Sequence, residues 1–179
     1  MLHRACRNIV IGGCFLLATI TQGFAADYDH TIEAKDITFS WKIDGDNLAG
    51  KIAAKTDGWV GVGFNPSEKM KDANFILGYV KDGETKIIDE YGTTSTGHKN
   101  DEDLGGKTDL TLVSGTEEGG MTTIEFVMPL KSGDDKDGEL VVDGDTVVLL
   151  AYGSGRDSFK SKHKFRTSIT VNLGTGAVK

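Results

Sequence analysis

The chain has 179 residues, 38% of them hydrophobic, and a formal net charge of −7 at pH 7. This length suits one domain with a sizeable core. The acidic charge disfavours nucleic acid and anionic membranes as partners, because both require a basic surface.

The first 25 residues have the pattern of a secretory signal peptide. Arg4 and Arg7 form a positive n-region, residues 9–20 are mostly apolar, and residues 23–25 supply small side chains for signal peptidase. We expect cleavage after residue 25, which leaves residues 26–179 as a single periplasmic or secreted domain with a charge of about −9. The apolar segment is short and no second one follows, so we expect no stable membrane span after cleavage.

Both cysteines, Cys6 and Cys14, lie in the segment that would be removed. The mature chain would therefore contain no cysteine. This excludes disulfides, zinc–thiolate sites, iron–sulfur clusters and the C-x-x-C-H attachment of c-type haem.

The remainder of the chain reads as all-β. Apolar residues alternate with polar or small ones, as in half-buried strands, at residues 37–43, 60–64, 124–128 and 169–173. Residues 147–152 are apolar on both sides, which predicts a central strand covered on both faces. Asp-Gly pairs favour tight turns at residues 44–45, 57–58, 82–83, 137–138 and 143–144. Strands interrupted this often predict a sandwich of two antiparallel sheets, with long loops at residues 93–107 and 132–139.

Two acidic runs, residues 101–103 and 134–138, lie in these long loops. The second run does not fit an EF-hand, because Gly133 stands where the first calcium ligand belongs and Gly144 where the closing glutamate belongs. We expect both runs to be solvated turns. The chain also lacks the G-x-S-x-G, phosphate-loop and H-E-x-x-H motifs of common enzymes.

Candidate metal ligands are few. His98 lies in the polar loop of residues 93–107, where exposure is expected. His163 lies just before the last strand, among basic residues that favour the neutral, metal-binding imidazole. Met70 lies in a loop between the apolar strands at residues 60–64 and 75–80. Most loop methionines cover a core edge, but the thioether is also a soft ligand for iron.

Several segments, taken together in their order and spacing, resemble a DOMON domain. They are residues 58–64, 70–73, 75–78, 124–130, 132–137, 150–153 and 163–166, so the resemblance extends from about residue 36 to about residue 173. It implies an immunoglobulin-like β-sandwich of a family found in extracytoplasmic proteins, whose members bind haem or sugars. In the haem b cytochrome domains of cellobiose dehydrogenases, a methionine after the glycine-rich strand and a histidine before the final strand ligate iron. The matching residues here are Met70 and His163.

The resemblance therefore implies a non-covalent haem b with Met70 and His163 as axial ligands. Because both axial positions are then filled, electron transfer is favoured over oxygen chemistry. We expect an electron carrier and not an enzyme, with a separate redox protein as its partner. Apolar walls are expected from Trp59, Val62, Phe64, Phe75 and Tyr79, and the candidates to pair with the haem propionates are Arg166, Lys69 and Lys71.

Three other functions stay open at this point, one of which is a structural adhesion module that would need neither ligand. A carbohydrate-binding module of the same fold would use Trp41, Trp59 or Tyr91 as stacking platforms, although alternation places Trp41 inside with Phe39. A haem sensor or haem-transfer protein would share the two ligands and differ in its rate of haem release and in its partner.

Overall fold

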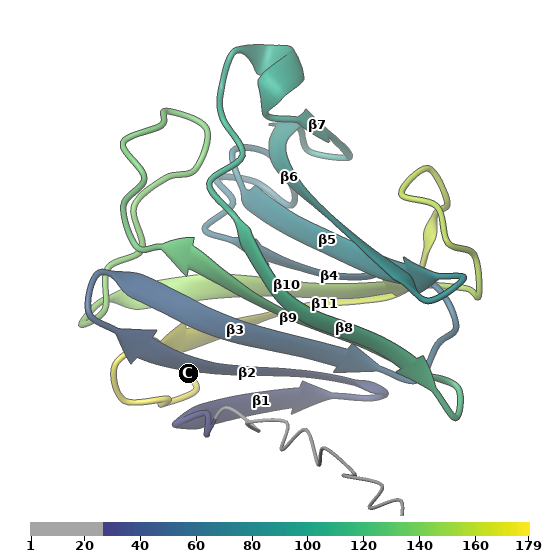
Figure 1. Ribbon diagram of the computed structural model, residues 1–179. Coiled ribbons are helices and arrows are strands. Elements are labelled where there is room, and N and C mark those ends of the chain that lie inside the picture. Colours follow the sequence, from purple (N-terminus) through teal and green to yellow (C-terminus); the bar gives the residue numbers. More distant parts are fainter. Residues whose placement is uncertain (1–26) are drawn as a thin grey trace, which may run out of the picture.

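The computed structural model describes residues 27–179 (Figure 1). Its elements are β1 (His30–Ala34), β2 (Ile37–Asp44), β3 (Asn47–Ala54), β4 (Val60–Phe64), β5 (Asn74–Lys81), β6 (Glu84–Thr94), β7 (Gly97–Asn100), the 3-10 helix η1 (Glu102–Leu104), β8 (Thr111–Glu118), β9 (Met121–Pro129), β10 (Asp145–Gly153) and β11 (His163–Asn172). No helix in this part of the chain is long and apolar enough to cross a membrane. The predicted signal peptide, residues 1–25, lies outside the described residues.

The strands form two antiparallel sheets that pack face to face, with the orders β1-β2-β3-β9-β8 and β11-β10-β4-β5-β6-β7. The predicted all-β sandwich is thus confirmed. Alternating apolar side chains of both sheets fill the core between them. Trp41 is fully buried there, as the alternation predicts. Its indole N–H donates to the Leu173 carbonyl oxygen at 2.9 Å, which ties β2 to the end of the chain.

The Asp-Gly pair at residues 82–83 forms a two-residue hairpin turn. Lys81 pairs with Glu84 across it, and Asp82 and Gly83 have φ angles of 53° and 80°. A type I′ turn requires positive φ angles at both central residues. Hairpins favour this turn because its twist matches that of the flanking strands. The turn connects β5 and β6 directly.

The prediction of one long loop at residues 93–107 is wrong, because the segment contains β7 and η1. β7 has no apolar alternation and depends on its pairing with β6, which extends from Thr94 and Gly97 to Glu90 and Asn100. Figure 1 shows β7 and η1 at the same end of the sandwich as the loop between β9 and β10.

The prediction of solvated acidic turns is also wrong for one residue in each run. Asp101 is 0% exposed and Asp137 is 6% exposed. The Asp101 amide donates to the Asp89 carbonyl oxygen on β6, and the Lys107 amide donates to the Asp134 carboxylate. These contacts draw the two loops together and enclose both carboxylates.

The outer face of the six-stranded sheet differs from the inner face. Along β10, Val148 and Leu150 are buried in the core, whereas Val147, Leu149 and Ala151 are only partly buried. The prediction that residues 147–152 are covered on both faces is therefore wrong. The physical reason is that part of the outer face forms the floor of a cavity.

Candidate functional site

Small residues make a hollow in the outer face of the six-stranded sheet. Gly61 pairs with Ala151, and Gly63 pairs with Leu149. A Cβ atom added at Gly63 would lie 2.5 Å from the Phe75 ring, so the ring occupies the space that glycine leaves. The hollow belongs to a cavity of about 710 Å³. Cofactor and ligand sites commonly have volumes of about 300–1,000 Å³, so the cavity is large enough for a cofactor beside β4.

The loop of residues 65–73, between β4 and β5, carries Met70 to the lining of this cavity. Its backbone is bound to β6, because the Asp72 amide donates to the Gly92 carbonyl oxygen and the Gly92 amide donates to the Ala73 carbonyl oxygen, each at 2.8 Å. A Cβ atom at Gly92 would overlap the Met70 carbonyl oxygen. The backbone thus fixes the position of Met70.

Asp72 fastens the same loop through its side chain. One carboxylate oxygen accepts the Tyr91 hydroxyl at 2.7 Å, and the other accepts the Ser67 hydroxyl. The hydrogen bond from Ser67, then that from Tyr91, holds the pKa of Asp72 below its usual value, and the charge of Lys71 acts in the same direction. Asp72 is therefore ionised and braced at neutral pH.

His163 enters the cavity from the opposite end of β4. It is the first residue of β11 and pairs with Gly153, whose amide donates to the Trp59 carbonyl oxygen at 2.8 Å. Arg166 Nη1 lies 3.2 Å from His163 Nε2. A guanidinium has only donors, so Nε2 is the acceptor in this contact. Nε2 then carries the lone pair that a metal would take.

The loop of residues 154–162 is held against the sheet by two aromatic residues. The Trp59 indole N–H donates to Ser161, with 2.9 Å to the hydroxyl oxygen. The rings of Tyr79 and Phe159 lie 4.6 Å apart between centroids. Because His163 follows this loop directly, the two contacts fix its approach to the cavity.

His98 also lines the cavity, contrary to the expectation of an exposed loop histidine. It lies on β7, its ring centroid is 5.4 Å from that of Phe75, and its Nδ1 pairs with the Glu90 carboxylate. Only Nε2 of His98 therefore remains to bind a ligand. The sequence carries no signal for this placement, since the pairing of β7 with β6 decides it.

The residues expected at the site divide into two groups. The cavity lining includes Met70, His163, Trp59, Val62, Phe75, Arg166 and Lys69. Phe64 lies in the core between the sheets, and Tyr79 packs on Phe159; neither lines the cavity, and nor does Lys71. Sequence reasoning missed the floor of Gly61, Gly63 and Ala151, although the alternation of glycine with bulky residues in β4 was an available signal.

The charges of the cavity are opposite to those of the whole chain. Its charged lining residues are Lys69, Lys162 and Arg166, and no carboxylate among residues 27–179 lines it. The whole chain has 27 acidic and 20 basic residues. A thioether and an imidazole are suitable ligands for haem iron, and the three cations suit its carboxylates. The donor set and the apolar floor therefore fit a haem.

Two curated relatives are similar to this chain over a single segment. MOXD1 homolog 2 of Drosophila melanogaster is 28% identical over 131 residues, which are 73% of this chain and 17% of that protein. DBH-like monooxygenase protein 1 of Homo sapiens is 27% identical over 139 residues, which are 78% of this chain and 21% of that protein. The chain thus spans about a fifth of the length of these relatives.

Two solved structures share the fold. The cytochrome b domain of pyranose dehydrogenase from Coprinopsis cinerea matches with a TM-score of 0.59 and 15% identity over 78% of each chain. The cytochrome domain of Myriococcum thermophilum cellobiose dehydrogenase matches with a TM-score of 0.58 and 13% identity, over 80% of this chain and 77% of that one. The DOMON domain family matches residues 33–153, more than half of the chain. The chain therefore belongs to the DOMON family.

Proposed function

We propose that this protein binds haem b non-covalently in the cavity on the outer face of β4, with Met70 and His163 as axial ligands, and that it transfers electrons. The observation that carries the proposal is one cavity lined by both residues and by cations without carboxylates. The likeness of the fold to two cytochrome b domains supports it.

Each part of the cavity has a distinct task in this function. Haem, when bound, supplies a one-electron iron couple. Met70 and His163 would fill both axial positions and leave no open position for oxygen, and the thioether favours the reduced iron. Trp59, Phe75 and the strand floor exclude water. Arg166 would leave His163 Nε2 and pair with a propionate, as the basic residues at the rim can also do.

We also propose that the protein is extracytoplasmic, periplasmic or secreted, and that it is an electron carrier and not an enzyme. A separate redox protein would then be its partner. The monooxygenase relatives are about five times as long as the shared segment, so their names imply no catalytic activity for this domain. The acidic surface would favour encounter with a basic partner.

Absorbance spectra of the mature protein supplied with haemin test the proposal. We expect a Soret band, and sharp α and β bands after reduction, as for low-spin six-coordinate iron. Met70→Ala and His163→Ala should each abolish the low-spin spectrum. Met121→Ala and His30→Ala are matched controls, since Met121 is 42% exposed and His30 lies on β1 of the other sheet, and both should keep it.

His98→Ala decides between the two histidines of the cavity. We expect its low-spin bands to persist. Their loss, with an unchanged spectrum in His163→Ala, would show that His98 is the ligand. Absence of a Soret band in the wild-type protein would sink the haem proposal as a whole. Release of haem within seconds to a haem-scavenging protein would indicate haem transfer in place of electron transfer.

The rival carbohydrate-binding function gains no support from the aromatic residues. Trp41 is fully buried, and Trp59 is 4% exposed. The Tyr91 hydroxyl is bound to Asp72. A stacking platform needs an exposed ring face, which neither tryptophan offers. Binding of an oligosaccharide that depends on one of these three residues would restore the carbohydrate function.

A further inference from the structure

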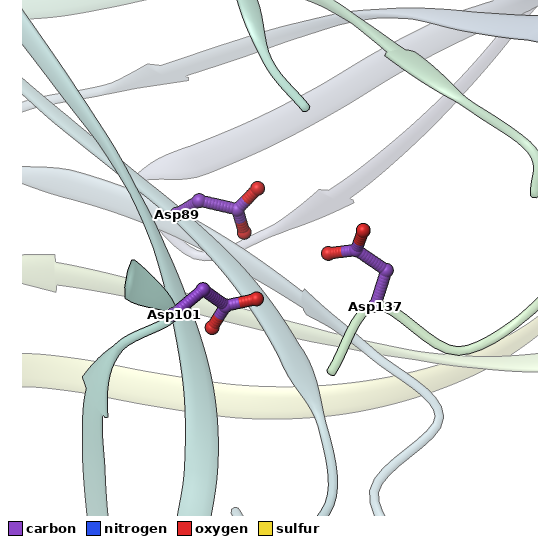
Figure 2. Close-up of side chains that lie close together, drawn as sticks. All are labelled: Asp89, Asp101 and Asp137. Atoms are coloured by element: carbon purple, nitrogen blue, oxygen red, sulfur yellow. The ribbon is translucent and has the colours of Figure 1, made fainter. Parts of the chain in front are cut away.

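Three buried aspartates converge at the end of the sandwich where β7 and η1 lie. Asp89 comes from β6, Asp101 immediately precedes η1, and Asp137 comes from the loop between β9 and β10. Their exposed fractions are 1%, 0% and 6%. One carboxylate oxygen from each lies within 4.8 Å of the others. Figure 2 shows the three carboxylates directed toward a common centre.

Most oxygens of these carboxylates lack a hydrogen-bond partner among the described residues. Both oxygens of Asp89, both of Asp101 and Oδ2 of Asp137 are buried without a partner. The Asp109 amide lies close enough to Asp89 to lower its pKa slightly, but it forms no hydrogen bond of ordinary geometry with it. Buried carboxylates are normally hydrogen-bonded, paired or bound to a metal.

A buried neutral side chain, Asn74, contacts the cluster. Asn74, the first residue of β5, is 2% exposed and donates its amide N–H to Asp137 Oδ1 at 3.0 Å. The Asn74 Oδ1 atom is buried and has no partner. An amide carbonyl oxygen is a usual calcium ligand. This second observation is independent of the acidic residues and adds an unused ligand beside them.

No basic side chain of the described residues forms an ion pair with Asp89, Asp101 or Asp137. The positive charge of Lys136 lowers the pKa of Asp101. The Lys136 Nζ atom itself lies over the Tyr91 ring and forms no ion pair with Asp101. Burial first, and then the neighbouring carboxylates, raise the pKa of Asp89 to about 8 and that of Asp101 to about 7. A bound cation would therefore stabilise the ionised carboxylates, and no basic side chain of the described residues does so by an ion pair.

We propose that Asp89, Asp101 and Asp137, with the Asn74 amide oxygen, bind one calcium ion. An all-oxygen ligand set is suited to Ca²⁺ or Mg²⁺. Calcium is favoured because the ligands come from four separate segments and are buried. Ca²⁺ accepts oxygen ligands in a flexible geometry, whereas Mg²⁺ demands a near-ideal octahedron and keeps several of its waters. The proposal does not depend on haem binding.

The surroundings of the cluster suit a cation site. A neighbouring hollow of about 410 Å³ is lined by Asp109, Asp134 and Asp135, together with Lys107 and Lys136. Asp134 itself is already used, because its two oxygens accept the amides of Lys107 and Lys136 at 2.7 and 2.9 Å. Asp134 thus shapes the loop that presents Asp137, and it is not one of the proposed ligands.

Calcium titration of the mature protein, after removal of metal with a chelator, tests the proposal. Calorimetry should give one Ca²⁺ per chain, and the melting temperature should rise with CaCl₂ much more than with MgCl₂. Asp89→Asn and Asp101→Asn should each weaken calcium binding by about tenfold or more, because each removes a ligand charge. The matched control is Asp103→Asn, an exposed aspartate of η1, which should bind calcium like the wild type.

The metal-free variants distinguish a cation site from a cluster that merely shares protons. In chelator near neutral pH, Asp89→Asn should melt at a higher temperature than the wild type, because asparagine needs no proton to be buried without charge, whereas the ionised aspartate of the unfolded chain must be neutralised on folding. In calcium, the wild type should melt at a higher temperature than Asp89→Asn. A wild-type protein whose melting temperature and calorimetric heat do not respond to CaCl₂ would overturn the proposal. So would equal calcium affinity in both cluster variants and the control.

Discussion

At the residue scale, Gly92 decides how closely the loop that carries Met70 approaches β6. Gly92→Ala places a methyl group on the Met70 carbonyl oxygen, and backbone atoms cannot move aside as a flexible side chain can. We expect a loss of about 1–3 kcal/mol in the free energy of unfolding, as for other overpacking substitutions. Urea denaturation of the two proteins measures it.

Gly144→Ala is the control for this substitution. Its added methyl group would meet Val141, a side chain that is 55% exposed and free to turn away. Its stability should change by less than about 0.5 kcal/mol. Equal denaturation midpoints for Gly92→Ala and Gly144→Ala would contradict the packing that fixes Met70.

The residue scale also shows where the sequence was sufficient and where it was not. Residue type and resemblance selected Met70 and His163, and both line the cavity. Phe64 was expected in the same site and lies in the core instead. Alternation with Gly63 puts the two residues on opposite faces of β4, but it does not say which face meets the other sheet. That choice depends on the packing of strands distant in sequence.

At the scale of elements, the loop of residues 154–162 positions His163 through its contacts with Trp59 and Tyr79. Phe159→Ala removes the ring that packs on Tyr79. Because Phe159 is only partly buried, we expect a loss of about 1–2 kcal/mol in stability, below the cost of truncating a fully buried phenylalanine. The proposed function adds a second expectation, which is faster transfer of bound haem to a scavenging protein.

Leu112→Ala provides the comparison for that variant. Leu112 lies on β8 in the other sheet and is 38% exposed. It should lose a little stability without a change in the rate of haem loss. If both variants release haem at the same rate as the wild type, the loop does not position the ligand.

Elements with strong alternation were predicted well, and elements held by pairing were not. β2, β4, β9 and β11 carry period-2 patterns, and all four form. β2 and β4 match their predicted ranges to within one residue, whereas β9 begins three residues and β11 six residues before the predicted start. β7 (Gly97–Asn100) consists of polar residues and glycine and forms because β6 offers it hydrogen bonds. Propensity and pattern describe a chain locally, whereas an edge strand of this kind depends on its neighbour.

At the scale of the whole molecule, charge is distributed in a way that composition does not show. The chain has a net charge of −7, yet its described residues, 27–179, place three cations and no carboxylate around the apolar cavity. It also buries three aspartates that lie between 12 and 48 positions apart. The acidic runs were visible in the sequence, but Asp89 lies outside them. Only the fold brings Asp89 to Asp101 and Asp137, so no spacing rule could have identified the cluster.

Stability should therefore depend on pH in opposite ways without and with calcium. The folded-state pKa values of Asp89 and Asp101, about 8 and about 7, lie above the value of about 3.9 for an unfolded aspartate. The folded protein then holds more protons than the unfolded chain between about pH 4 and pH 8. In that window the free energy of unfolding falls as the pH rises. In chelator, the melting temperature should therefore be lower at pH 8 than at pH 5.

With calcium present, the proposed site holds the same carboxylates ionised, so protons compete with the cation and stability should rise from pH 5 to pH 8. Asp137 acts in the same direction as Asp89, because its pKa is also raised, chiefly by burial. Asp72 has a lowered pKa, so its contribution is lost only on acidification below this range. Asp89→Asn should flatten both profiles, whereas Asp103→Asn should reproduce the wild-type pair. Parallel melting profiles in chelator and in calcium would show that the buried aspartates do not bind the ion.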